Sequence, residues 1–252
     1  DAPVFGADVS LQKARSAAFF SATDAGDFIR ALAEPAVLLN PNLTPRRVLD
    51  LRPTAASFEA FVGRAALDGS VAFSARAIGN LARPFYPDGI LSAAPGPLSA
   101  PRGQWSPFAT GFQLDLVLNG IVQHVAHTAG LPGFANDTPD NCAGVALGSG
   151  ASTVASRQLA NGLQIFPGGV PVYRGDRLVG AVGVSGDGID QDDMTAFLSV
   201  HRVGLRLGSG LGNAPSARRA DQLTPQGARL RYVQCPYAPF LGSNAQNVCA
   251  GL

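Results

Sequence analysis

The chain has 252 residues, of which 46% are hydrophobic and 15% are charged, and its formal net charge is +1. This composition is typical of a folded globular protein and excludes an intrinsically disordered chain. The near-neutral charge gives no support for a nucleic-acid partner, and no apolar run reaches the ~20 residues of a membrane-spanning helix.

The first predicted elements along the chain are helices. Residues 8–20 (DVSLQKARSAAFF) and residues 24–33 are expected to be helical, the second helix ending before Pro35. A capping Thr54 followed by apolar residues at helical spacing predicts a third helix over residues 54–66. Residues 71–78 (VAFSARAI) alternate and predict a strand.

The middle of the chain is rich in proline and glycine. Residues 83–108 are expected to be irregular. The aromatic side chains expected to anchor this segment are Phe85, Tyr86, Trp105 and Phe108.

Residues 112–129 predict an apolar helix that ends at Gly130. His124 and His127 lie three residues apart near its end, so they share a face and could offer two imidazoles to a metal or to haem iron. The alternative is that both rings interact with the carbonyls of the last helical turn, which requires no ligand.

The most informative stretch is residues 168–200 (GGVPVYRGDRLVGAVGVSGDGIDQDDMTAFLSV). Apolar residues alternate on either side of Gly175-Asp176, which predicts an antiparallel hairpin with a tight turn. A glycine loop then leads into a helix with Asp190 at its N-cap and with Asp192 and Asp193 in its first turn. Capping explains these acids more simply than a calcium loop, because the residue order of an EF-hand is missing.

This stretch resembles the last third of the GlcG/HbpS-like family, which comprises small α/β domains associated with haem binding and also occurs at the C-terminus of PduO-type proteins. The resemblance rests on GGVPV, LVGAVGVSG and DQDD, and residues 8–20 are similar to the helix that precedes this region in the family. It implies an α/β (α+β) fold in which helices pack on an antiparallel sheet.

The resemblance also implies a domain organisation. A single composite domain is expected over residues 1–207, with family blocks at 8–34 and 161–205, an insertion at 35–160 and an irregular extension at 208–252. The family's first helix and hairpin have no counterpart here, so the sheet is expected to expose an edge. We expect a homo-oligomer, or an upstream or companion polypeptide, to complete it.

In haem-binding members, the helix similar to residues 8–20 carries two acids three residues apart, and a hydroxyl residue before the GG motif lies near the iron. Here Asp8 keeps the first position, whereas Leu11 and Leu163 stand at the other two. The residues that remain as candidates for binding haem are Asp8, Lys13, Arg15, His124 and His127.

Three cysteines are present. Cys235 and Cys249 bracket a loop without helical or strand periodicity, and we expect a disulfide between them. Such a bond indicates the periplasm or the cell exterior. Cys142 either pairs with an upstream segment or stays buried, and the spacing of the three cysteines does not match a zinc site.

Motifs that indicate catalysis are missing. There is no G-x-S-x-G, and GSGAST at residues 148–153 lacks the lysine of a phosphate-binding loop, so no catalytic residue is assigned. The favoured function is binding of haem, another tetrapyrrole or a related small ligand, without turnover. The alternatives are a non-catalytic structural or accessory subunit of a larger assembly and, third, an enzyme that acts on a small molecule.

Overall fold

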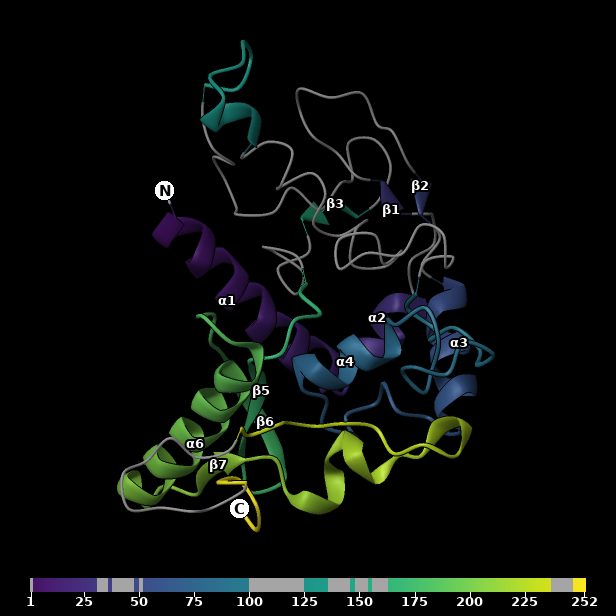
Figure 1. Cartoon of the computed structure of the whole chain (residues 1–252), viewed down its shortest axis with the longest axis vertical. Coiled ribbons are helices and arrows are strands. Elements are labelled where there is room, and N and C mark those ends of the chain that lie inside the picture. The colour runs from purple at the N-terminus through teal and green to yellow at the C-terminus, as the bar shows by residue number, and fades with distance from the viewer. Residues whose placement is uncertain are drawn as a thin grey trace.

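The computed structural model describes residues 2–30, 36–37, 48–49, 52–99, 125–135, 146–147, 154–155, 163–236 and 247–252. In this part of the chain, helices pack on a three-stranded antiparallel sheet with strand order β6–β5–β7 (Figure 1). The expected α+β fold is therefore confirmed.

The elements have the following bounds. The helices are α1 (Ala2–Phe20), α2 (Ala25–Arg30), α3 (Arg52–Val62), α4 (Ala75–Leu81) and α6 (Ile189–Leu207). The strands are β1 (Ala36–Val37), β2 (Val48–Leu49), β3 (Ala146–Leu147), β4 (Val154–Ala155), β5 (Gly169–Arg174), β6 (Arg177–Gly183) and β7 (Leu211–Asn213). Three short 3₁₀ turns follow at Ser216–Arg218, Ala220–Gln222 and Pro225–Gly227.

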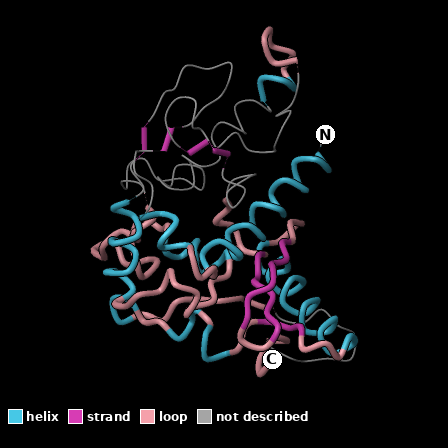
Figure 2. The backbone as a smooth tube through the Cα atoms, turned by 180° about the vertical axis from the view of Figure 1, so that it is seen from behind, coloured by secondary structure: helices cyan, strands magenta, loops and turns pink. Residues whose placement is uncertain are grey.

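The hairpin β5–β6 forms as expected, with its turn at Gly175, whose φ is +58°. Its register pairs Gly169 with Gly183 and slips by one residue near Val172. β7 pairs with the other edge of β5, so β5 is the central strand. Figure 2 shows these three strands together, apart from the two-residue pairs β1–β2 and β3–β4.

One expected strand is a helix instead. Residues 71–74 lead into α4, whose N-cap is Ser74, and the Ser74 side chain accepts a hydrogen bond from the backbone N–H of Ala77. The alternation over residues 71–78 was misleading because residues 71–82 are all buried. Where every side is buried, the apolar period no longer distinguishes a strand from a helix.

Helix α1 approaches the sheet through glycines. A Cβ atom at Gly183 would lie 1.9 Å from the Ser10 carbonyl oxygen, and one at Gly169 would lie 2.2 Å from the Lys13 carbonyl oxygen. Backbone contact at these two positions requires residues without side chains. The sequence places glycine at both, and α1 is therefore seated directly on β5 and β6.

An aromatic cluster joins α1 and α3 to the segment before α4. The Phe58 ring lies 5.9 Å from that of Phe20 and 5.5 Å from that of Phe73, and all three side chains are buried. Pairs at such distances contribute beyond the burial of their area. The cluster fixes the position of α4 relative to α1.

The segment after α6 is only partly irregular. It supplies β7, and Ala72 pairs with Arg219 in an isolated parallel bridge. Further along, the Tyr86 hydroxyl donates to the Ala228 carbonyl at 2.7 Å. Cys235 and Cys249 lie at disulfide-bonding distance, with Cα atoms 6.0 Å apart. The segment is thus attached to the body at several points.

Candidate functional site

The site lies where α4, residues 163–168 and the start of α6 meet. Helix α4 approaches the Ile165 backbone at Gly79, where a Cβ atom would lie 2.4 Å from the Ile165 carbonyl oxygen. This contact aligns Arg76, one turn before Gly79, with the first turn of α6. Gly79 therefore allows α4 to pack closely enough for Arg76 to reach the acids of α6.

Arg76 is shared between two carboxylates. Its Nε donates to Asp193 Oδ2 at 2.5 Å, and its other end pairs with Asp190. Asp193 is 0% exposed and also accepts hydrogen bonds from the backbone N–H groups of Gly168, at 2.7 Å, and Gln234, at 2.9 Å. Burial raises the pKa of Asp193 above its ordinary value, and the Arg76 charge opposes this rise.

A second buried ion pair holds α1 to α6. Lys13 Nζ lies 2.8 Å from Asp192 Oδ2 and also donates to the Val184 carbonyl at 2.8 Å. Lys13 is 2% exposed and Asp192 is 4% exposed. The Lys13 charge is thus neutralised by Asp192 inside the protein, between α1 and α6.

The acids at the start of α6 are therefore not caps. The N-cap is Gly188, without a side-chain hydrogen bond, so the expectation that Asp190 caps the helix is wrong. Asp192 and Asp193 point to cations on α1 and α4 instead. Their position in the first turn still places negative charge at the positive end of the helix dipole.

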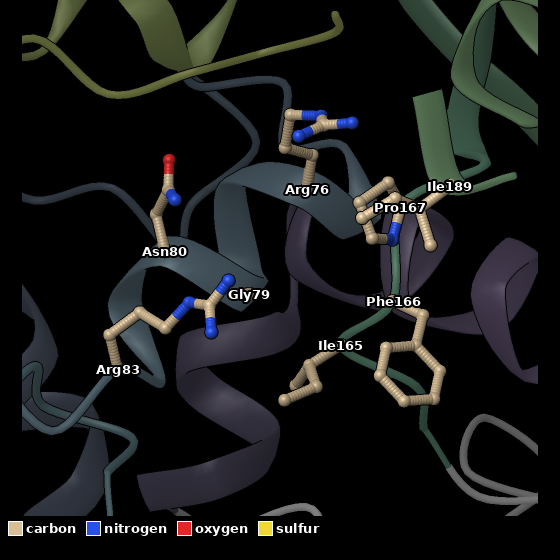
Figure 3. A pocket seen from close by; sticks show the side chains of 8 residues that line it. All are labelled: Arg76, Gly79, Asn80, Arg83, Ile165, Phe166, Pro167 and Ile189. Carbon is tan, nitrogen blue, oxygen red and sulfur yellow. The ribbon is translucent and has the colours of Figure 1, made fainter. Parts of the chain in front are cut away.

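A cavity of about 140 Å³ opens beside Arg76. Figure 3 shows Arg76 and Asn80 on α4 and Arg83 just after it at one side, with Ile165, Phe166, Pro167 and Ile189 at the other. Arg83 forms a surface ion pair with Asp88 at 3.6 Å, and its side chain is 43% exposed. The cavity thus combines two guanidinium groups with an apolar wall, an arrangement suited to the acidic end of a mostly apolar ligand.

Among the candidates named from the sequence, the three that the structure describes do not line this cavity. Lys13 belongs to the α1 junction, and Arg15, also on α1, has a pKa lowered by burial. The Nδ1 atom of His127 lies 2.9 Å from the carbonyl oxygen of Phe134, which lies in the loop after the helix and not in its last turn. His124 and the side chain of Asp8 lie outside the described residues.

Two of the family's positions can be located. Leu163 is buried at 2% exposure, whereas Leu11 is 43% exposed. The space expected between the residue 8–20 helix and the Leu163 segment is closed by contact, since the Ser16 hydroxyl donates to the Gln164 carbonyl at 2.6 Å and accepts from the Gln164 N–H. The two elements are therefore in direct contact at Ser16 and Gln164.

Sequence reasoning missed Arg76 and the partners of the acids. Arg76 lay in a predicted strand, and no motif pointed to it. The available signal was the run of acids in DQDD, which exceeds what one helix cap needs and requires cations elsewhere. Which cations meet them depends on packing between segments more than 100 residues apart.

The described residues contain no group of three or more His, Cys, Asp or Glu side chains placed to hold a metal ion. Within the same residues, no helix is both long and apolar enough to cross a membrane.

Comparisons with known proteins place the site beside a recognisable region. No curated protein and no solved structure matches the chain. A family model described as haem degrading protein HbpS-like matches residues 119–199, which include β5, β6 and most of α6. The match also takes in residues 119–160, expected to be insertion, and leaves α1 outside. Residues 119–199 are therefore similar to a family described as haem degrading, as the resemblance of residues 168–200 indicated.

Proposed function

We propose that the protein binds haem or a related tetrapyrrole, and that the cavity beside Arg76 and Arg83 receives an acidic edge of this ligand. The observation that carries the proposal is the HbpS-like match over residues 119–199. Ile165, Phe166, Pro167 and Ile189, the apolar wall of the cavity, lie within the matched residues.

The cavity could hold only one part of a haem, and the positions of its charges indicate which part. A haem combines a flat apolar ring with carboxylate side chains, and the cavity pairs guanidinium groups with apolar side chains. Its volume, about 140 Å³, is below the ~300–1,000 Å³ of pockets that enclose a drug-sized ligand. It would therefore receive the carboxylate edge, and the ring would extend beyond it.

Arg83 is the residue most suited to the ligand carboxylate. Arg76 is 7% exposed and already shared by Asp190 and Asp193. Arg83 is exposed, and its 3.6 Å pair with Asp88 is of the surface kind, which contributes little and can be exchanged at low cost. Haem itself would supply any iron chemistry; the residues described here bind and orient its acidic edge.

A titration with hemin tests the proposal. We expect a saturable Soret shift, and the same affinity trend for metal-free protoporphyrin, because the anchor is a carboxylate. Arg83→Ala should weaken binding by roughly tenfold, since a charge-assisted bidentate contact is lost. Arg64→Ala removes an exposed arginine on a loop away from α4 and should leave the affinity unchanged. An unsaturable, nonspecific spectrum would overturn the proposal.

A non-catalytic accessory subunit is the second candidate. It is favoured by the buried cations, since Lys13 and Arg76 are both neutralised by the protein's own acids. Strand β6 adds to this, because it is an edge strand within the described sheet and could pair with a second copy or a companion polypeptide. Absence of hemin binding combined with a native mass above 25.9 kDa would favour this candidate.

We also propose a periplasmic or extracellular location. The support is the pair Cys235 and Cys249 at disulfide distance. Alkylation of the native protein without reductant should leave these two cysteines unmodified. Modification of both in freshly isolated protein would contradict this location.

A further inference from the structure

We propose that one end of the molecule docks on an anionic lipid surface. This basic apolar end comprises Arg174, Arg177, Val203, Leu205, Arg206 and Leu207. It is formed by the turn of the β5–β6 hairpin and the last two turns of α6, away from the cavity at α4. The inference is independent of haem binding.

The two parts of this end are held together by the backbone. The Gly175 N–H in the hairpin turn donates to the Gly210 carbonyl at 3.3 Å. Arg174 pairs across the sheet with Leu211, the residue whose carbonyl lies against Gly204 of α6. Figure 1 shows α6 and β7 side by side at this end. The surface is therefore a fixed part of the fold.

Three apolar side chains on the last turns of α6 face solvent. Val203 is 48% exposed, Leu205 is 71% exposed and Leu207 is 59% exposed. Single exposed apolar residues are common in globular proteins, whereas here Val203 and Leu207 share one face of α6 and Leu205 lies on another, so apolar side chains surround the tip of the helix. The helix ends directly afterwards at Gly208, so these side chains project at the tip of the element.

The charges around these side chains are positive, apart from Asp176 in the hairpin turn. Arg174 and Arg177 lie directly opposite each other in the hairpin, an arrangement of like charges that costs stability. Residues 194–213 contain no Asp or Glu, and the one acid of the turn, Asp176, lies 3.5 Å from Arg218. Among the ion pairs of the described residues, none involves Arg174, Arg177 or Arg206.

An anionic lipid surface fits this combination. Arginine heads can meet lipid phosphates while valine and leucine side chains enter the boundary with the acyl chains. A second copy fits less well, because a two-fold contact would place the same arginines against each other.

Flotation of the full chain with vesicles tests the inference. We expect binding to vesicles of phosphatidylglycerol and phosphatidylcholine at low salt, and weak binding to pure phosphatidylcholine. Binding should fall by about fivefold for each positive charge removed, and high salt should weaken it. Arg206→Glu, which reverses one charge, should therefore show a larger loss than Arg206→Gln.

Two equally exposed leucines test whether vesicle binding depends on this surface or on any exposed leucine. Leu205 and Leu91 are both 71% exposed, but Leu91 lies in the loop after α4. Leu205→Ser should reduce vesicle binding, and Leu91→Ser should not. Equal binding to neutral vesicles, no binding to either kind, or equal effects of the two leucine substitutions would overturn the inference. Binding to polyglutamate but not to vesicles would instead identify an acidic polypeptide as the partner, and would overturn it as well.

Discussion

Two junctions fasten helices to the start of α6, and they are built differently. At the α1 junction, Lys13 pairs with Asp192 alone, and glycines bring the α1 backbone onto the sheet. At the α4 junction, Arg76 is shared by Asp190 and Asp193, and the C-terminal extension joins in through Gln234. The α1 junction is closed by backbone contact, whereas the α4 junction borders a cavity. Space for a ligand therefore lies beside α4.

The largest expected effect comes from removing the shared cation. Arg76→Ala would leave Asp193, which is 0% exposed, as an uncompensated buried charge, and should lower the free energy of unfolding by about 3–5 kcal/mol. Arg83→Ala, two residues after the end of α4, removes a surface pair with Asp88 and should cost less than about 1 kcal/mol. Urea unfolding of both variants tests this. Equal losses would mean that Arg76 does not hold the junction.

The α1 junction should respond less strongly to the same kind of change. Lys13→Met leaves a single acid, Asp192, without its cation and should cost about 3 kcal/mol in urea unfolding. Adding Asp192→Leu should restore part of this loss, because replacing both partners of a buried pair with apolar residues is often nearly neutral. A double variant less stable than Lys13→Met would show that Asp192 has a further essential contact.

The disulfide tests how much the extension contributes to the α4 junction. Gln234, which contacts Asp190 and Asp193, directly precedes Cys235. Cys235 and Cys249 are 14 residues apart, so replacing both with serine should cost roughly 3 kcal/mol. Thermal unfolding with and without reductant provides the control, since reductant should destabilise the wild type and leave the double variant unchanged. An equal reductant effect on both would show that the loss does not come from this disulfide.

Backbone contact at the α1 junction can be tested with a single methyl group. Gly183→Ala would place a Cβ atom 1.9 Å from the Ser10 carbonyl oxygen and should cost about 1–3 kcal/mol as α1 is pushed away. Gly212→Ala in β7 meets nothing within 4 Å and should change stability by less than about 0.5 kcal/mol. Thermal unfolding distinguishes the two. A neutral Gly183→Ala would contradict the close approach of α1 to β6.

The smallest effect concerns the contact between Tyr86, in the loop after α4, and the extension. Burial raises the pKa of Tyr86 from 10.0 to about 12, so its protonated form is favoured by folding. Its contribution to stability is complete below pH 10 and is lost as the pH rises through 12. Tyr86→Phe should cost about 1 kcal/mol at neutral pH, through the lost bond to Ala228, and should flatten the decline above pH 10. An identical alkaline decline in both proteins would exclude Tyr86 as its source.

Local sequence patterns predicted the helices and strands that are buried on one face and exposed on the other. The β5–β6 hairpin was predicted from the alternation of apolar residues around Gly175-Asp176, because a strand with one buried face places apolar residues at every second position. The helical spacing of residues 8–20 and 54–66 was equally readable: residues 8–20 lie in α1, and residues 54–62 lie in α3, which ends four residues before the predicted boundary. Alternation failed at residues 71–78, because all of them are buried and apolarity carries no directional information there.

The candidate site was less predictable, for a physical reason. The sequence made Lys13 a candidate for binding haem, yet Lys13 forms an ion pair with Asp192, 179 residues further along the chain. Arg76 carried no signal at all, because a buried arginine and an exposed one look alike in sequence. Charge pairing at such separations depends on which helices pack together, and that in turn depends on contacts such as Gly79 against Ile165.

The sequence by itself thus determined the α+β class, the hairpin with its following helix, and the HbpS-like character of residues 168–200, because turns, caps and periodicities act over a few residues. Only the tertiary structure decided the partners of Asp190, Asp192 and Asp193, the contact of α1 with the sheet and the position of the cavity beside α4. These features arise where remote segments meet, and their energies depend on burial, which belongs to the folded chain as a whole.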